Sequence, residues 1–163
     1  MAERIAFLIV EDVAVLRRAL TRRMSSYGRA DGVGSYKEAQ KALKKTRYDS
    51  LILDVALPDG IGLDLVPYAR SLWPAIWVLV LTGSHDHAVI TRIHELGVRY
   101  LLKPFHPTQL KVHADETETR RTASDRRMNI VLDRWTRGHD LTTSEAELLA
   151  LGAHGVPRDQ FSI

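Results

Sequence analysis

The sequence predicts an α/β fold, with a doubly wound, five-stranded parallel sheet followed by a C-terminal helical extension. Two observations carry this prediction. Short apolar runs alternate with segments of helical period over the first hundred residues, an order typical of parallel strands joined by right-handed crossovers. After residue 107 the alternation stops, and a long stretch without Gly or Pro begins. The helical extension is therefore expected there.

The strands are predicted from runs of apolar residues and the helices from apolar residues at helical spacing. The first helix, for example, has Val13, Leu16, Leu20 and Met24 separated by arginines. The predicted strands are residues 5–10, 29–33 (the weakest), 50–54, 75–81 and 98–102. The predicted helices are residues 13–26, a helix from Ser35 to Lys45, and residues 62–71, 87–96 and 108–137.

Local signals define where several elements begin and end. Ser35 with Glu38 three residues later has the spacing of a capping box at a helix start. Leu57–Gly60 has turn chemistry, and Gly97 is placed to stop the helix before it. Gly138 is expected to break the last long helix.

Composition limits the function classes. The 163 residues can hold one domain of ordinary size, and 45% hydrophobic and 26% charged residues are typical of a globular protein. The longest apolar run, Ala75–Leu81, is far shorter than the roughly 20 residues of a membrane span, so no membrane partner is expected. The absence of cysteine excludes disulfides and thiolate metal sites, and it fits a cytoplasmic location. The arginines of residues 120–137 are more typical of a solvated helix face than of a nucleic-acid site.

Polar side chains follow four of the apolar runs directly. They are Glu11-Asp12, Asp54, Thr82 and Lys103, the last followed by Pro104. Because the carboxyl ends of parallel strands meet at one edge of a sheet, we expect these side chains to converge. Any one of them alone is more simply a loop or capping residue, but five at matching strand ends are not a coincidence.

Such a set suits a divalent metal and a phosphoryl group. Asp12 and Asp54 are hard oxygen ligands of the kind that Mg²⁺ takes, and Glu11 suits a metal-bound water. Asp54 is also a candidate nucleophile that forms an aspartyl phosphate. Lys103 would supply a second cation and Thr82 a hydroxyl donor to a phosphoryl oxygen.

These motifs resemble the receiver domains of two-component response regulators over residues 4–115. The resemblance is carried by Val10–Asp12, Leu53–Leu63, Leu81–Gly83 and Tyr100–Phe105. It implies a flavodoxin-like fold in which Asp54 accepts phosphate from a sensor histidine kinase, without enzymatic turnover of a substrate. The receiver domain is assigned to residues 1–115.

The resemblance further implies roles for individual residues. Asp12 and Asp54 would bind Mg²⁺ with help from Glu11 and the main-chain carbonyl of Ala56. Thr82 and Tyr100 would form a switch pair, although a strand tyrosine such as Tyr100 is equally well explained by packing. Lys103-Pro104 is similar to the family's lysine followed by a cis proline peptide.

Two segments follow the receiver. Residues 116–138 are expected to form a helical linker; its middle is nearly all polar, which favours a solvated helix over a coiled coil. Residues 139–163, through Leu141–Leu151, resemble the opening of a LuxR-type helix-turn-helix domain. The sequence ends at Ile163, before any recognition helix. DNA binding is therefore expected only if a complete output domain follows; the alternative is that the protein keeps a fragment of one.

The leading function is thus a phosphorylation-controlled regulator of transcription, with a homodimer on phosphorylation left open. One alternative is an interaction module that acts through protein contacts of the linker and does not bind DNA. Another is a Mg²⁺-dependent phosphohydrolase of the haloacid dehalogenase type. That type requires Asp-x-Asp after its first strand, whereas this chain has adjacent Glu11 and Asp12 there.

Overall fold

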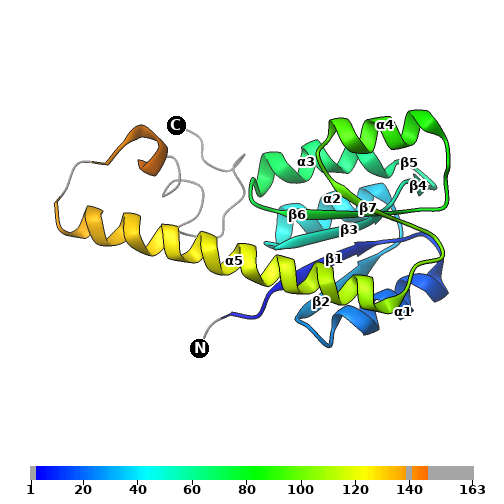
Figure 1. The fold of residues 1–163 in the computed structure, drawn as a ribbon, viewed down its shortest axis with the longest axis horizontal. Helices are drawn as coiled ribbons and strands as arrows, with labels where there is room; N and C mark the ends of the chain where they lie inside the picture. The colour runs from blue at the N-terminus through cyan, green and yellow to red at the C-terminus, as the bar shows by residue number, and fades with distance from the viewer. Residues whose placement is uncertain (1–2, 139–140, 147–163) are drawn as a thin grey trace.

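A computed structural model describes residues 3–138 and 141–146 of the chain. Five parallel strands form one sheet in the order β2-β1-β3-β6-β7 (Figure 1). The strands are β1 (Ala6–Val10), β2 (Arg29–Val33), β3 (Ser50–Asp54), β6 (Trp77–Thr82) and β7 (Arg99–Leu102). The chain crosses from one half of the sheet to the other after β2, so the predicted doubly wound sheet is confirmed.

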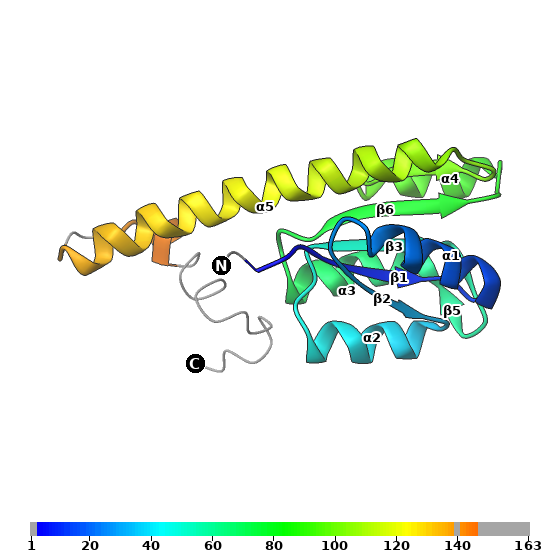
Figure 2. The same ribbon diagram turned by 90° about the horizontal axis from the view of Figure 1, so that it is seen from below.

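Helices cover both faces of this sheet. On one face lie α1 (Ala14–Met24) and the first part of α5 (Pro107–Thr136), packed on β1, β3 and β6. On the other lie α2 (Tyr36–Lys45), α3 (Leu65–Leu72) and α4 (His87–Glu95). Figure 2 shows α5 running along one face and continuing well beyond the sheet. The three central strands are buried on both faces, which explains why their sequences are continuous apolar runs.

The structure differs from the sequence-based prediction after β3. The turn residues lie in a short antiparallel hairpin of β4 (Ala56–Leu57) and β5 (Gly60–Ile61). A 3₁₀ turn at Gly62–Asp64 follows, so α3 begins three residues later than predicted. A Cβ atom built on Gly62 would lie 1.9 Å from the carbonyl oxygen of Asp54. Only glycine therefore lets the chain fold back so closely on the end of β3.

The start of α2 also differs in detail from the expected capping box. The Ser35 hydroxyl does accept a hydrogen bond from the Glu38 N–H (3.2 Å). The Glu38 carboxylate, however, accepts from the N–H of Gly34 (2.7 Å) rather than from that of Ser35. The predicted strand 75–81 is likewise shifted, because the chain turns at residues 74–75 and β6 begins at Trp77.

Helix α5 runs without interruption across residue 115, where the receiver was expected to end. The polar stretch after that residue is not fully solvated, contrary to expectation. Thr117 is buried, and the Arg121 side chain is only 13% exposed. Polar residues make these contacts, which is why the apolar pattern alone did not reveal them.

Arg121 fastens α5 to the amino-terminal edge of the sheet. Its Nη1 lies 2.7 Å from Oδ2 of Asp49, and the same oxygen accepts the Ala6 N–H at 2.8 Å. Glu3 and Asp125 lie 3.5 Å from other nitrogens of the guanidinium. The first strand, the start of β3 and the helix are thus joined around one carboxylate.

A second buried contact joins α5 to β3. Nε2 of His113 lies 2.7 Å from Oγ of Ser50, and both residues are buried. Nδ1 of His113 is buried and has no hydrogen-bond partner among the described residues. Burial lowers the pKa of His113 from 6.5 to about 4; the nearby Glu116 carboxylate opposes this and Arg99 adds to it. The imidazole is therefore neutral at neutral pH.

This arrangement predicts a loss of stability in mild acid. Between about pH 6.5 and pH 4 the unfolded chain holds a proton on His113 that the folded chain does not. The free energy of unfolding should therefore fall as the pH falls through this window, by at most about 1.4 kcal/mol per pH unit. Urea unfolding at pH 7 and pH 5, followed by tryptophan fluorescence, measures the effect. His113→Gln should lose this part of the pH dependence, and an unchanged slope in the variant would contradict the assignment.

The described residues after α5 agree with the expected helix break. Gly138 has a positive φ of 74°. Residues 143–146 are helical, with Oε2 of Glu145 accepting the Thr142 N–H at 2.8 Å, and Glu145 also pairs with Arg134 of α5. The predictions for His139-Asp140 and for residues 147–163 lie outside the described residues. Within the described ranges, no helix has the length and apolar content needed to cross a bilayer.

Candidate functional site

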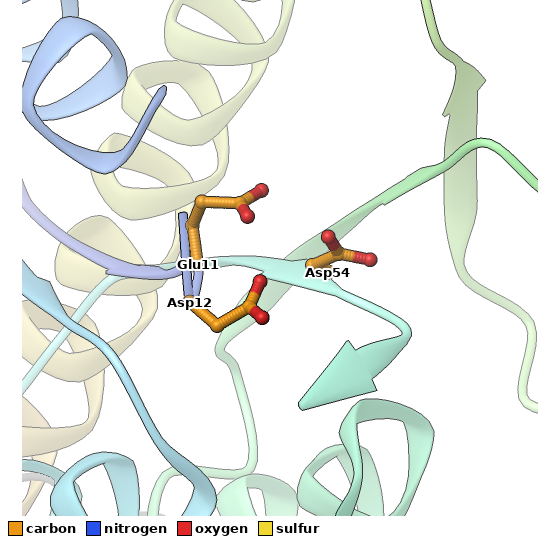
Figure 3. Close-up of side chains that lie close together, drawn as sticks. All are labelled: Glu11, Asp12 and Asp54. Carbon is orange, nitrogen blue, oxygen red and sulfur yellow. The ribbon is translucent and has the colours of Figure 1, made fainter. Parts of the chain in front are cut away.

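The acidic residues lie together at the carboxyl edge of the sheet. In the register of β1 and β3, Val10 is paired with Leu53, so the residues that follow them are neighbours across the two strands. One carboxylate oxygen each of Glu11, Asp12 and Asp54 lies within 4.8 Å of the others. Figure 3 shows Glu11 and Asp12 on the turn after β1, with Asp54 beside them on β3. The strand register alone thus accounts for the cluster.

The three carboxylates differ in exposure. Glu11 is 1% exposed, the Asp54 side chain is 13% exposed, and Asp12 faces solvent. Burial raises the pKa of Glu11, and the negative charge of Asp54 adds to the rise, while the bonds from Lys103 and the Val13 N–H oppose it. A buried acid beside a second acid favours a cation in the same place.

Lys103 supplies such a cation. Its Nζ lies 2.8 Å from Oδ2 of Asp54 and 3.0 Å from Oε2 of Glu11, although β6 separates β7 from β3 in the sheet. Burial lowers the pKa of Lys103, but its bonds to the two carboxylates outweigh this and raise it. The ammonium therefore stays charged and bridges two of the three acids.

The ends of β6 and β7 hold Thr82 and Lys103 in place. The Thr82 carbonyl accepts the Lys103 N–H at 2.8 Å, and the Lys103-Pro104 peptide is cis, as the resemblance implied. Thr82 is buried, and its hydroxyl oxygen accepts the Ser84 N–H at 3.0 Å. The hydroxyl group thus lies at the end of β6, next to the end of β7 that carries Lys103.

Tyr100 lies on β7, on the face covered by α4. It is half-buried and packs edge-on against His94, with ring centroids 5.9 Å apart and planes at 86°. Both open interpretations of this residue, packing and switching, are compatible with that contact. Its role in switching stays a prediction.

The hairpin of β4 and β5 follows Asp54 in the chain and contacts its carboxylate. The Ala56 N–H donates to Oδ1 of Asp54 at 3.2 Å. Ala56 is exposed on β4, and its role as a carbonyl ligand stays a prediction. At the tip of the hairpin, the Asp59 carboxylate accepts the N–H groups of Tyr36 (2.7 Å) and Lys37 (3.1 Å) at the start of α2. The hairpin beside Asp54 is therefore tied to a helix terminus.

The residues present fit a magnesium ion. Mg²⁺ takes oxygen ligands and usually keeps several waters. The cluster offers three carboxylates, one of them facing solvent where waters can complete the coordination. Asp12 and Asp54 would hold the ion directly, with Glu11 and Ala56 as the further candidates.

Sequence reasoning found the acids, the lysine and the threonine, but it missed the role of Asp59. That residue was interpreted only as part of a turn. Its partners, Tyr36 and Lys37, lie 23 and 22 residues earlier, and no local pattern links them. These two bonds lower the pKa of Asp59, so the carboxylate is charged where it meets the positive end of the helix dipole.

Comparison with known proteins agrees with this geometry. Residues 7–115 match the response regulator receiver domain family. The chain therefore belongs to this family.

Individual relatives are regulatory proteins of bacteria. The chain is 32% identical over 111 residues to the transcriptional regulatory protein CitB of Klebsiella pneumoniae, covering 66% of this chain and 47% of that protein. It is 29% identical over 166 aligned positions to the DNA-binding transcriptional activator DevR/DosR of Mycobacterium tuberculosis, covering 94% of this chain and 76% of that protein. The chain thus spans about half of CitB and three quarters of DevR/DosR.

The fold is similar to solved receivers. A response regulator receiver protein from Pseudomonas putida superposes with a TM-score of 0.66 at 30% identity, covering 71% of this chain and 99% of that one. The similarity thus includes nearly the whole of that receiver protein but only part of this chain.

Proposed function

We propose that Asp54 accepts a phosphoryl group from a sensor histidine kinase in a Mg²⁺-dependent reaction. The observation that carries the proposal is the convergence of Glu11, Asp12 and Asp54 with the Lys103 ammonium at one edge of a receiver fold. Asp54 is the only one of the three acids on β3, and its Oδ1 and Oδ2 already accept bonds from Ala56 and Lys103. Those donors would hold the carboxylate in place for attack.

In the proposed step a carboxylate oxygen of Asp54 attacks the phosphorus of a phosphohistidine. The new P–O bond forms as the P–N bond breaks, and the released imidazole nitrogen takes up a proton. Mg²⁺ held by Asp12 and Asp54 would supply positive charge that offsets the repulsion between the carboxylate and the anionic phosphoryl donor. The Lys103 ammonium would pair with the phosphoryl oxygens as a second cation, and the Thr82 hydroxyl would donate a hydrogen bond to one of them.

The product would act as a switch rather than as an enzyme. Reorientation of the Thr82 hydroxyl toward the phosphoryl group would leave room behind it for Tyr100 to turn inward. A coupling of about 1–3 kcal/mol is enough to shift such an equilibrium several-fold to a hundredfold. The acylphosphate is then lost by slow hydrolysis, and no other substrate is turned over.

For the intact protein we propose regulation of transcription in the cytoplasm. Under this proposal residues 1–115 are the receiver, 116–138 the helical linker and 139–163 the start of a LuxR-type output segment. The similarity to DevR/DosR, described as a DNA-binding transcriptional activator, extends over 94% of this chain and supports the proposal. DNA binding belongs to this proposal only if the intact protein has a complete output domain. Homodimerisation on phosphorylation belongs to the same proposal.

Phosphorylation by a small-molecule donor tests the function directly. The chain incubated with acetyl phosphate and Mg²⁺ should gain one phosphoryl group in intact-mass spectrometry. With EDTA in place of Mg²⁺ the gain should disappear, because the acidic cluster then repels the anionic donor. A gain that does not depend on the metal, or no gain at all, would count against the proposal.

A further inference from the structure

Arg17 lies next to the acidic cluster but belongs to none of the roles assigned so far. It sits in the first turns of α1, and its side chain reaches back toward the turn between β1 and α1. Nη1 donates to the main-chain carbonyl oxygens of Glu11 (2.8 Å) and Asp12 (3.3 Å). These are the carbonyl groups of two of the three candidate metal-site residues.

The contact completes the bonding of the turn. The Glu11 N–H donates to the Val33 carbonyl at 3.1 Å, and Oε1 of Glu11 accepts the Val13 N–H at 3.1 Å. Arg17 donates hydrogen bonds to the main-chain carbonyl oxygens of Glu11 and Asp12. The N–H and carbonyl of Glu11 and the carbonyl of Asp12 are thus hydrogen-bonded, which restricts the orientation of the peptide planes in this turn.

Two glycines at the end of β2 leave the space for this side chain. A Cβ atom built on Gly34 would lie 2.8 Å from Nη1 of Arg17, and one built on Gly32 would lie 2.6 Å from Oγ1 of Thr21 and 3.0 Å from Cγ of Arg17. In the described part of the chain, glycines with positive φ occur only at positions 97 and 138. Backbone conformation therefore does not require glycine at 32 and 34; the side chain of Arg17 accounts for the glycine at 34, and Thr21 and Arg17 together account for the one at 32.

We propose that Arg17 is a positioning residue for the metal site: by holding the Glu11 and Asp12 carbonyls, it fixes the direction of their side chains before the ion arrives. The proposal rests on the Mg²⁺-dependent function proposed above. It predicts that displacing the guanidinium weakens binding of a divalent ion, although Arg17 makes no contact with the ion.

The direction of the change in cation affinity distinguishes a positioning role of Arg17 from an effect of its charge. Arg17→Met removes a positive charge near an acidic cluster, and charge alone would make cation binding tighter. Loss of orientation should make it weaker, by about tenfold, as for other groups that orient metal ligands. A weaker binding constant in a folded Arg17→Met variant therefore indicates lost positioning and not the change in charge.

A second variant moves the guanidinium without removing it. In Gly34→Ala the new methyl group would meet Nη1 at 2.8 Å, which is the mobile end of a long side chain. That end can move aside at little cost to folding, so the variant keeps both the fold and the charge. Arg18→Met, a change at the neighbouring exposed arginine of α1, is the matched control.

Binding of Mn²⁺ alone, measured on the full chain by the loss of the free-ion signal in electron paramagnetic resonance, is the readout. Arg17→Met and Gly34→Ala should each bind about tenfold more weakly than the wild-type chain, while Arg18→Met should not. Urea unfolding of each variant shows whether folding changes. Wild-type or tighter binding by Gly34→Ala overturns the role of Arg17, whatever the stability of Arg17→Met. Absence of binding by the wild-type chain overturns the proposed function as well.

Discussion

Replacing Asp54 by asparagine should abolish phosphate incorporation. Asparagine has nearly the same shape, so the fold and the hairpin bond to Ala56 can persist, but the amide is not a nucleophile toward phosphorus. The variant also leaves Lys103 with one carboxylate partner, Glu11, instead of two. Both changes act on the chemical step, so the expected loss is complete rather than graded.

Intact-mass spectrometry after treatment with acetyl phosphate and Mg²⁺ measures this result. Asp115→Asn is the matched control: Asp115 is an exposed aspartate of α5 that pairs with Lys111 at the surface. It should gain one phosphoryl group like the wild-type chain. A full gain by Asp54→Asn would mean that another residue is the acceptor, and the proposal would have to be given up for Asp54.

The acidic site could be located from the sequence because each of its members ends an apolar run. Strands β1 and β3 are buried on both faces and therefore have continuous apolar sequences. A polar residue that follows such a run must lie at the carboxyl edge. Neighbouring positions in the sheet then bring Glu11 and Asp54 together, and nothing beyond strand order is needed.

The supporting contacts could not be located in this way. Asp59 caps a helix that begins 23 residues before it, and Arg121 binds a carboxylate 72 residues away. Neither residue breaks an apolar pattern, and both are charged residues of a kind that is usually exposed. Their partners become visible only when the chain is folded.

Arg17 is an intermediate case. Its partners are main-chain carbonyls of Glu11 and Asp12, which no side-chain pattern can indicate. The glycines at positions 32 and 34 leave space that side chains of α1 use, but the sequence does not say which side chains they are.

The end of the receiver along α5 depends on contacts rather than on sequence similarity. The family match stops at residue 115, yet Thr117 and Arg121 are still packed against the sheet. A helix that is continuous through this point can transmit a change in the receiver to whatever follows it. How firmly its first part is attached therefore matters for signalling.

The variant Arg121→Met tests how strongly α5 is attached to the sheet. The change removes the cation beside Asp49, whose side chain is only 7% exposed, and leaves its carboxylate with the Ala6 N–H at 2.8 Å. Removing one partner of a largely buried ion pair leaves an uncompensated charge, so we expect the free energy of unfolding to fall by about 3 kcal/mol. Urea unfolding followed by the fluorescence of Trp73 and Trp77, which lie near this edge, gives the value.

Two further variants separate the ion pair from general effects on the helix. Arg127→Met removes an exposed arginine from the same helix and should change the free energy of unfolding by less than about 0.5 kcal/mol. Adding Asp49→Asn to Arg121→Met removes the stranded charge, so the double variant should be less destabilised than the sum of the two single changes. If Arg121→Met were no worse than Arg127→Met, the contact would not hold α5 to the sheet. The attachment of α5 would then depend on its other buried contacts, such as that of His113 with Ser50, and not on this ion pair.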